Sequence, residues 1–189
     1  MKKIGILAVQ GAFAEHASML ERLGAEIVLL RKASDLGQPL DGLVLPGGES
    51  TVQGKLLREL EMFEPVRNLI LDGIPVMGTC AGMILLAKHL DQDDTVHLGL
   101  MDITVRRNAY GRQLGSFTAK EEFADKGPVD MTFIRAPFIT DAGENVDILS
   151  KVDGNIVAAK QDNMLALSFH PEVTDDLTVH HYFLDMINK

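Results

Sequence analysis

The chain has 189 residues, 46% of them hydrophobic and 24% charged, a composition that excludes a disordered chain, a collagen-like repeat and a coiled coil. Its formal net charge of −9 argues against nucleic acid and anionic membranes as partners, because a negative field repels phosphate. The single cysteine excludes an intramolecular disulfide and a cysteine-rich metal cluster. The first apolar run, residues 4–9, is too short for a signal peptide or a membrane span, so we expect a cytoplasmic protein with one domain over residues 1–189.

Apolar strands alternate with helical patterns in the first half of the chain. The predicted strands are residues 4–9, 26–30, 43–45 and 74–77. The predicted helices are residues 13–23, 51–72 with an interruption near Pro65, and 81–90. Strands that are apolar on both faces are typical of a buried parallel sheet, and the helices between them cover its two faces. We therefore predict an α/β fold with an open, mostly parallel, twisted sheet and helices on both faces.

The second half of the chain reads as strands with little helix between them. The predicted strands are residues 101–105, 114–117, 132–135, 146–150, 156–160 and 164–169. Because short connections join antiparallel neighbours, we expect hairpins or an antiparallel extension of the sheet. A closing helix is predicted over residues 175–187, with four candidate core residues: Leu177, Phe183, Leu184 and Ile187.

The only cysteine lies on a turn between the strand 74–77 and the helix that follows it. Residues 78–82 read Gly-Thr-Cys-Ala-Gly, the thiol form of a nucleophile elbow. Such a turn holds its central residue in a strained backbone conformation, and glycine on either side avoids collision with neighbouring backbone. The amino end of the following helix favours the thiolate. We therefore predict that Cys80 is a nucleophile, with a buried structural cysteine as the alternative.

A candidate base and its orienting group lie near the end of the chain. His170 follows the last predicted strand, so it should lie at the same edge of the sheet as Cys80. Pro171 restricts His170 to extended geometry, in which residues i and i+2 project to the same side. Glu172 would then reach the imidazole and hold one tautomer.

Two further loops follow predicted strands and reach the same edge of the sheet. One contains Gln10 and Gly11, and the other is Pro46-Gly47-Gly48-Glu49-Ser50. Paired glycines let backbone amides approach a ligand closely, which suits part of an oxyanion hole. A phosphate-binding loop is less well supported, because the Gly-Lys-Ser/Thr ending is missing. A tight turn that caps a helix with Ser50 remains the alternative.

We predict no metal site. The acidic stretch 91–94 reads as a solvated loop. The neighbouring His180 and His181 lie on a predicted helix, where adjacent side chains diverge and cannot share a metal ion.

These loops, taken in chain order, resemble those of the class I (triad-type) glutamine amidotransferases. More narrowly, the chain resembles the glutaminase subunits of pyridoxal 5′-phosphate synthase, which implies a flavodoxin-like fold. The segment 120–130 matches that pattern least well. The matching strings cover nearly the whole chain: GILAVQG (5–11), LPGGEST (45–51), GTCAG (78–82), RNAYGRQ (107–113), FIRAP (133–137), AGENV (142–146), VAAKQ (157–161) and SFHPEVT (168–174).

The resemblance implies that the chain hydrolyses L-glutamine to L-glutamate and ammonia. Cys80 would attack the side-chain amide carbon, His170 would pass a proton to the leaving ammonia, and Glu172 would orient His170. The backbone amides of Gly48 and Ala81 would form the oxyanion hole. The glutamine-binding positions that the resemblance implies are Gly47, Gly48, Glu49, Arg107, Ile134 and Arg135. Either arginine could hold the substrate α-carboxylate through paired hydrogen bonds, and Gln10 matches a position near the active site and the partner interface.

The resemblance also implies a partner, a synthase barrel subunit (PdxS-type) that would use the ammonia for pyridoxal 5′-phosphate (vitamin B6) biosynthesis, and it implies no cofactor. A glutaminase of another pathway, such as histidine or folate-related synthesis, shares the triad and is opposed only by the RNAYGRQ and FIRAP strings. A catalytically silent regulatory partner is opposed by the intact Cys80, His170 and Glu172. A cysteine peptidase of related fold usually has histidine directly after the cysteine, where this chain has Ala81.

Overall fold

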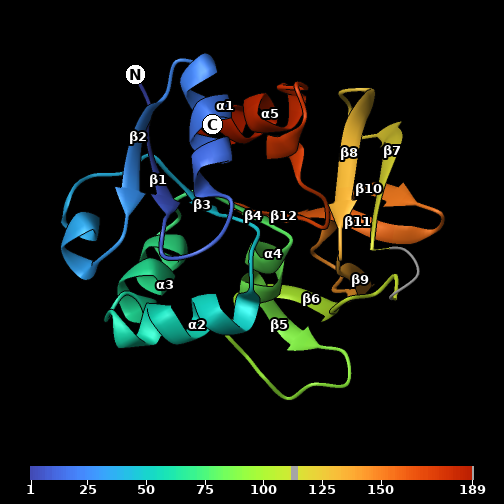
Figure 1. Ribbon diagram of the computed structural model, residues 1–189, viewed down its shortest axis with the longest axis horizontal. Helices are drawn as coiled ribbons and strands as arrows, with labels where there is room; N and C mark the ends of the chain where they lie inside the picture. The colour runs from blue at the N-terminus through green and yellow to red at the C-terminus, as the bar shows by residue number, and fades with distance from the viewer. Residues whose placement is uncertain (112–114, 189) are drawn as a thin grey trace.

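A sheet of ten strands forms the centre of the protein in the computed structural model, which describes residues 1–111 and 115–188 (Figure 1). The first part of this sheet is parallel and has the order β2-β1-β3-β4-β12. Its strands are β1 (Lys3–Leu7), β2 (Glu26–Leu30), β3 (Gly42–Leu45), β4 (Val76–Thr79) and β12 (Met164–Leu167). All residues of β3, β4 and β12 are buried, because helices cover both faces here.

Helices pack on both faces of the parallel strands (Figure 1). One face carries α1 (Phe13–Arg22) and α5 (Thr178–Ile187), whose buried Leu20 and Phe183 belong to one apolar cluster. The other face carries three helices packed in a second apolar cluster: α2 (Ser50–Glu59), α3 (Phe63–Leu71) and α4 (Ala81–Leu86). The α/β sheet with helices on both faces is therefore confirmed.

Beyond β12 the same sheet continues with mostly antiparallel pairings. The order from β12 is β11-β9-β6-β5, and β10 pairs with β11 outside this path. These strands are β5 (Ala87–Leu90), β6 (Met101–Arg106), β9 (Phe138–Ala142), β10 (Asp147–Val152) and β11 (Asn155–Gln161). Only the β5–β6 pair in this part is parallel among the described residues. The antiparallel extension expected from the second half of the chain is confirmed.

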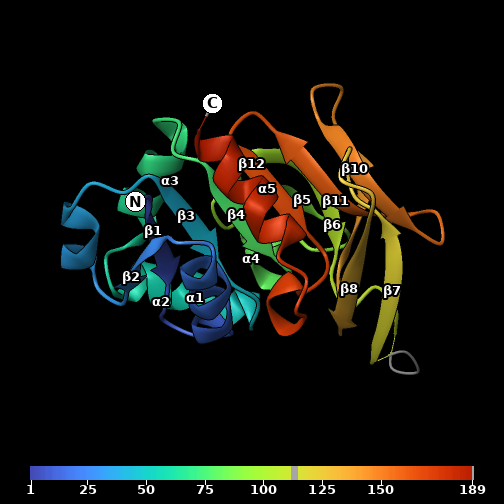
Figure 2. The ribbon, with the colours of Figure 1, turned by 90° about the horizontal axis from the view of Figure 1, so that it is seen from above.

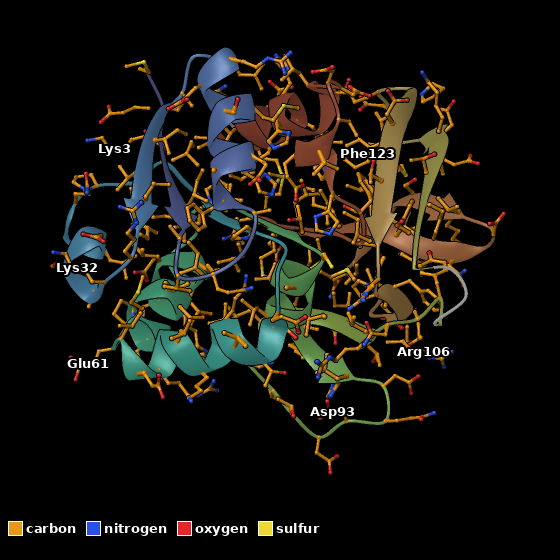
Figure 3. All side chains as sticks on the ribbon, viewed as in Figure 1. Lys3, Lys32, Glu61, Asp93, Arg106 and Phe123 are labelled. Carbon is orange, nitrogen blue, oxygen red and sulfur yellow. The ribbon has the colours of Figure 1, made fainter. Side chains whose placement is uncertain are left out.

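A small second sheet stands beside β10 and β11 (Figure 2). It consists of β7 (Ser116–Glu122) and β8 (Pro128–Ile134), and it contains most of the segment 120–130. Phe123, labelled in Figure 3, is fully buried, and its ring meets that of Tyr182 in α5 edge-on with the centroids 5.2 Å apart. This contact joins the hairpin to the body of the protein.

The helix predicted over residues 81–90 is wrong in its second half. The helix α4 ends at Leu86, and Ala87 is extended and starts β5. The carbonyls of Leu85 and Leu86 accept hydrogen bonds from the amides of Leu98 and Leu100, both at 2.9 Å, instead of from a further helical turn. The chain switches to a strand here because β6 offers it a partner, which no local pattern signals.

Other elements also differ from the prediction in their bounds or have no counterpart in it. The predicted helix 51–72 is two helices, and the break lies at residues 60–62, while Pro65 lies in the first turn of α3, where proline is tolerated. The strand β9 has no counterpart in the prediction, and short 3₁₀ turns occur at η1 (Ala33–Gly37) and η2 (Pro171–Val173). The closing helix begins at Thr178 rather than at residue 175.

Three residues of the predicted patterns lie outside the described residues: Arg112 and Gln113 of the RNAYGRQ string, and Leu114 of the predicted strand 114–117. Within the described residues, no helix combines the length and the apolar character that crossing a membrane requires.

Candidate active site

Cys80 lies on the sharp turn between β4 and α4. Its backbone has φ 51° and ψ −101°, a conformation that strains a residue with a side chain. The amide of Cys80 donates to the carbonyl of Leu167 in β12 at 2.8 Å, and the carbonyl of Cys80 accepts from Ile84 at 3.2 Å. These bonds hold the turn between strand and helix, so the elbow geometry expected for residues 78–82 is present.

The two glycines of the elbow are required by close backbone contacts. A Cβ atom at Gly78 would lie 2.7 Å from the backbone of Gly82. A Cβ atom at Gly82 would overlap the carbonyl of Leu45 at the end of β3. The elbow therefore packs directly against the strand that leads into the Pro46–Ser50 loop, and only hydrogen fits between them.

His170 and Glu172 lie at the carboxyl end of β12, which is the neighbour of β4 in the sheet. The Nδ1 atom of His170 is 2.6 Å from Oε1 of Glu172, and both residues are buried. The backbone amide of His170 also donates to the carbonyl of Thr132 in β8 at 2.8 Å. The expected extended chain from His170 to Glu172 is wrong, because Pro171–Val173 forms a 3₁₀ turn, and this turn places the carboxylate beside the ring.

The charge balance at this pair favours an imidazolium next to a carboxylate. Burial alone would lower the pKa of His170, but hydrogen bonds with Cys80 and Glu172 outweigh it and raise the pKa to about 10. Burial alone would likewise raise the pKa of Glu172, but His16 and His170 outweigh it, so the pKa lies below its usual value. Nδ1 of His170 faces Glu172, so Nε2 is the nitrogen left for Cys80. A charged imidazole beside a thiol is the arrangement that makes cysteine a good nucleophile at neutral pH.

We expect His170 to remain protonated at pH 8 and to lose its proton near pH 10, because its pKa is raised to about 10. The measurement is the ring proton shift of His170 by NMR between pH 5 and pH 11, with assignment by the His170→Asn variant. Removing the sulfur in Cys80→Ala should lower the midpoint, since Cys80 contributes to the rise. A wild-type midpoint at the ordinary value of about 6.5 would contradict this charge balance.

The Pro46–Ser50 loop lies against both Gln10 and His170. The side-chain oxygen of Gln10 accepts from the amide of Glu49 at 2.9 Å, and the amide of Ala12 donates to the carbonyl of Gly47 at 3.0 Å. A Cβ atom at Gly47 would overlap the imidazole of His170. The loop is thus held by the turn after β1, and its first glycine touches the candidate base directly.

One cavity of about 340 Å³, a size typical of small-molecule sites, contains most of the candidate residues. The candidates that line it are Gln10, Gly48, Glu49, Cys80, Arg107, Ile134, Arg135 and His170. Three candidates do not line the cavity but contact or adjoin a residue that does. Gly47 packs against His170, Ala81 follows Cys80 as the first residue of α4, and Glu172 is bonded to His170. Four lining residues were not predicted: Ser50, Ile84, Asn108 and Pro137.

Arg107 is held at the rim of this cavity by the loop after β5. Its guanidinium lies 3.5 Å from Oδ2 of Asp93 and 3.4 Å from Oγ1 of Thr51. The preceding Arg106 pairs with Asp91 at 2.6 Å, and Figure 3 labels Asp93 and Arg106 at the same edge of the molecule. The acidic stretch is thus a loop whose carboxylates position the two arginines.

Sequence patterns assigned no role in the site to three buried polar side chains near Glu172: His16 of α1, Thr79 of β4 and His180 of α5, which was considered only as a metal ligand. A signal was available for the two histidines. His16 lies on the buried stripe of α1 with Met19 and Leu20, and His180 lies on the buried stripe of α5 with Phe183. A histidine on an apolar helical stripe is a candidate for a buried polar contact.

Comparison with known proteins supports one family. The model of the SNO glutamine amidotransferase family matches residues 6–189. The pyridoxal 5′-phosphate synthase subunit PdxT of Methanocorpusculum labreanum is 60% identical over 185 residues, which cover 98% of this chain and 97% of that protein. The subunit of the same name from Streptococcus pneumoniae is 58% identical over 190 residues, which cover 99% of this chain and 98% of that protein.

Solved structures agree with this assignment. A crystal structure of a glutamine amidotransferase superimposes with a TM-score of 0.93 at 41% identity, and the match covers 98% of this chain and 99% of that one. A structure of PurLQS from Thermotoga maritima has a TM-score of 0.66 at 15% identity, covering 99% of this chain and 97% of that one, and shows likeness of fold alone. Together, the family model over residues 6–189 and the full-length relatives show that this chain belongs to the SNO glutamine amidotransferase family.

Proposed function

We propose that this chain is the glutaminase subunit of a pyridoxal 5′-phosphate synthase and that it acts as one glutaminase domain over residues 1–189. The observation that carries the proposal is the placement of Cys80 on a strained turn beside His170, whose Nδ1 atom is 2.6 Å from Glu172. The names of the full-length relatives support the choice of pathway.

The proposed reaction has two steps that share one sulfur and one imidazole. The Sγ atom of Cys80 attacks the side-chain amide carbon of glutamine, and Nε2 of His170 gives its proton to the leaving nitrogen, which departs as ammonia. A glutamyl thioester remains on Cys80. A water molecule then attacks the thioester while Nε2 takes one of its protons, and glutamate leaves as the thiolate and imidazolium form again.

The proposed oxyanion hole uses two backbone amides. Ala81 is the first residue of α4, and the first amides of a helix have no acceptor within the helix. Gly48 lines the cavity, and Gly47 before it packs against His170. Removal of one such donor typically costs about 10²- to 10³-fold in turnover, so the hole is a large part of the proposed catalysis.

The charges around the cavity suit an amino acid zwitterion. Arg107 and Arg135 line it together with the carboxylate of Glu49. We propose that one arginine pairs with the α-carboxylate and that Glu49 lies near the α-ammonium group, with Ile134 at the rim beside Arg135. Gln10, which bonds to the amide of Glu49, would then set the position of the substrate-binding loop.

The proposed partner is a PdxS-type barrel subunit that receives the ammonia. Free ammonia in water near neutral pH is mostly protonated, and ammonium is not a nucleophile, so direct transfer between subunits preserves its reactivity. Docking of the barrel subunit is proposed to raise glutamine hydrolysis by this chain.

The proposed function is tested by labelling and by turnover. We expect the electrophilic glutamine analogue 6-diazo-5-oxo-L-norleucine to add one adduct per chain, on the peptide that contains Cys80, by mass spectrometry. Release of glutamate from glutamine should rise when a PdxS-type subunit is titrated in. The D-enantiomer of the reagent serves as the control for recognition of the substrate, and it should label far more slowly.

Two outcomes would contradict the proposal at different levels. Absence of an adduct, both with and without the barrel subunit, would remove the glutaminase mechanism. Labelling together with a hydrolysis rate that stays constant up to saturating barrel subunit would retain the glutaminase and contradict activation by docking of that subunit.

A further inference from the structure

Two buried histidines continue the line of polar groups behind His170 and Glu172. His16 and His180 are both fully buried. The Nδ1 atom of His16 is 2.9 Å from Nε2 of His180, and Nε2 of His16 is 3.4 Å from Oε2 of Glu172 and 3.1 Å from Oγ1 of Thr79. The two histidines come from α1 and α5, which lie side by side on one face of the sheet (Figure 1).

The second carboxylate oxygen of Glu172, Oε2, needs a hydrogen-bond donor. The first oxygen is bonded to His170, whereas Oε2 is buried and has no hydrogen-bond partner among the described residues. A buried carboxylate oxygen without a donor costs free energy, and it also lets the carboxyl group rotate away from the imidazole that it orients. The Nε2 atom of His16 lies 3.4 Å from Oε2, close enough for a small shift to bring an N–H onto it.

The contacts favour one proton arrangement in this line. A carboxylate only accepts, so His16 should carry its proton on Nε2, facing Glu172 and Thr79. Its Nδ1 is then an acceptor, and Nε2 of His180 must be the donor to it. This leaves Nδ1 of His180 unprotonated, which agrees with its having no partner among the described residues. The reverse arrangement would direct a lone pair of His16 at the carboxylate and bury an unpaired N–H on His180.

The pKa of both histidines is lowered, which favours their neutral forms, and in a neutral His16 an Nε2–H would lie 3.4 Å from Oε2 of Glu172 as a potential hydrogen-bond donor. Burial lowers the pKa of His16, although the charge of Glu172 opposes it. Burial, together with the neighbouring His16, lowers the pKa of His180 to about 3. The 2.9 Å separation of their nitrogens is that of a direct hydrogen bond, whereas a bridging zinc ion would need to sit about 2.0–2.1 Å from each nitrogen.

We propose that His16, itself held by His180, is a positioning residue that donates a hydrogen bond to the second carboxylate oxygen of Glu172 and thereby fixes His170 for glutamine hydrolysis. The inference rests on the proposed function, because it assigns a role within that reaction. Residues that support the reaction would then include not only those at the cavity but also His16 and His180, which lie on the face of the sheet covered by α1 and α5.

A matched pair of substitutions separates the two nitrogens of His16. In His16→Gln the side-chain amide nitrogen lies near the former Nε2 and still donates to Glu172. In His16→Asn the amide lies near the former Nδ1, so the contact with His180 is kept and the donor to Glu172 is lost. We expect His16→Gln to keep kcat within about threefold of wild type and His16→Asn to lower kcat by about 10- to 100-fold at nearly constant KM, the range for a hydrogen bond to a charged group. The exposed neighbour His181, in His181→Asn, is the control and should leave kcat unchanged.

The pH profile of kcat provides a readout that a packing defect would not move. The titratable groups that face Glu172 and His16 are His170, His180 and, from the first turn of α1, Glu15. Loss of the donor raises the pKa of Glu172, so the acid limb of the profile should shift to higher pH in His16→Asn and stay in place in His16→Gln. Nitrogen NMR of histidine-labelled wild-type protein should show His16 as the Nε2–H tautomer.

The results that would contradict the role of His16 differ from those that would contradict the proposed function. Equal kcat and equal acid limbs in wild type and His16→Asn, or an Nδ1–H tautomer of His16, would overturn the role of His16. Equal impairment of both variants without a shift of the acid limb would assign His16 to packing and also overturn it. If His16→Asn fails to fold, His180→Gln and His180→Asn are compared by the same criteria, since only the former keeps a donor near Nε2. A wild type that does not hydrolyse glutamine would instead sink the proposed function.

Discussion

Replacing Cys80 with alanine is expected to abolish ammonia release from glutamine while the protein remains folded. The variant lacks the proposed nucleophile, and loss of such a group typically lowers turnover by about 10⁴-fold or more. The change removes one buried sulfur atom, so the free energy of unfolding should change by less than about 2 kcal/mol. Ammonia release is measured at saturating glutamine, and stability by urea unfolding followed by circular dichroism.

A second substitution at the same position tests the elbow itself. Cys80→Gly removes the sulfur as well, but glycine tolerates φ 51° and ψ −101° without strain. Strain at such a position costs about 1–3 kcal/mol, part of which is offset by the greater freedom of glycine in the unfolded chain. We therefore expect Cys80→Gly to be about 1 kcal/mol more stable than Cys80→Ala. Ammonia release near the wild-type rate in either variant would rule out Cys80 as the nucleophile.

Substitution of Gly82 with alanine is expected to destabilise the protein strongly and to eliminate its activity. The new Cβ atom would overlap the backbone of Leu45, and neither α4 nor β3 can move without disturbing the sheet. Overpacking against side chains costs about 1–3 kcal/mol, and a clash with backbone should reach or exceed the upper end of this range. The measurement is the free energy of unfolding in urea, together with the rate of labelling of Cys80.

The matched control is Gly37→Ala. No heavy atom lies within 4 Å of the position that a Cβ atom would take at Gly37, and the backbone there is not in the left-handed region. The control should therefore stay within about 0.5 kcal/mol of wild type. A Gly82→Ala variant as stable as this control would contradict the proposed contact between the elbow and β3.

The parts of the site that depend on local chain geometry were predictable from the sequence. The elbow around Cys80 follows from two glycines at fixed spacing between an apolar strand and a helix. The meeting of Cys80 and His170 follows from a second rule, that the carboxyl ends of parallel strands lie at one edge, because β4 and β12 are neighbours in the sheet. Their roles in catalysis stay predictions.

The features that depend on distant partners could not be predicted. Residues 81–90 are apolar enough for a helix, and the switch to β5 after Leu86 arises only from pairing with β6. The contact between His16 and His180 joins residues 164 positions apart, so no local pattern could reveal it. The position of Glu172 was expected for the wrong reason, since a 3₁₀ turn and not an extended chain brings it to His170.

The single thiol of this chain makes the stoichiometry of labelling easy to measure. Because the sequence holds one cysteine, and that residue borders the cavity while only 8% of it is exposed, a thiol-selective electrophile consumed by the folded protein reports on a single atom. Moles of reagent bound per mole of polypeptide therefore equal the fraction of molecules whose Cys80 thiol is accessible and reactive. A preparation can thus be standardised by counting adducts, with no reference enzyme.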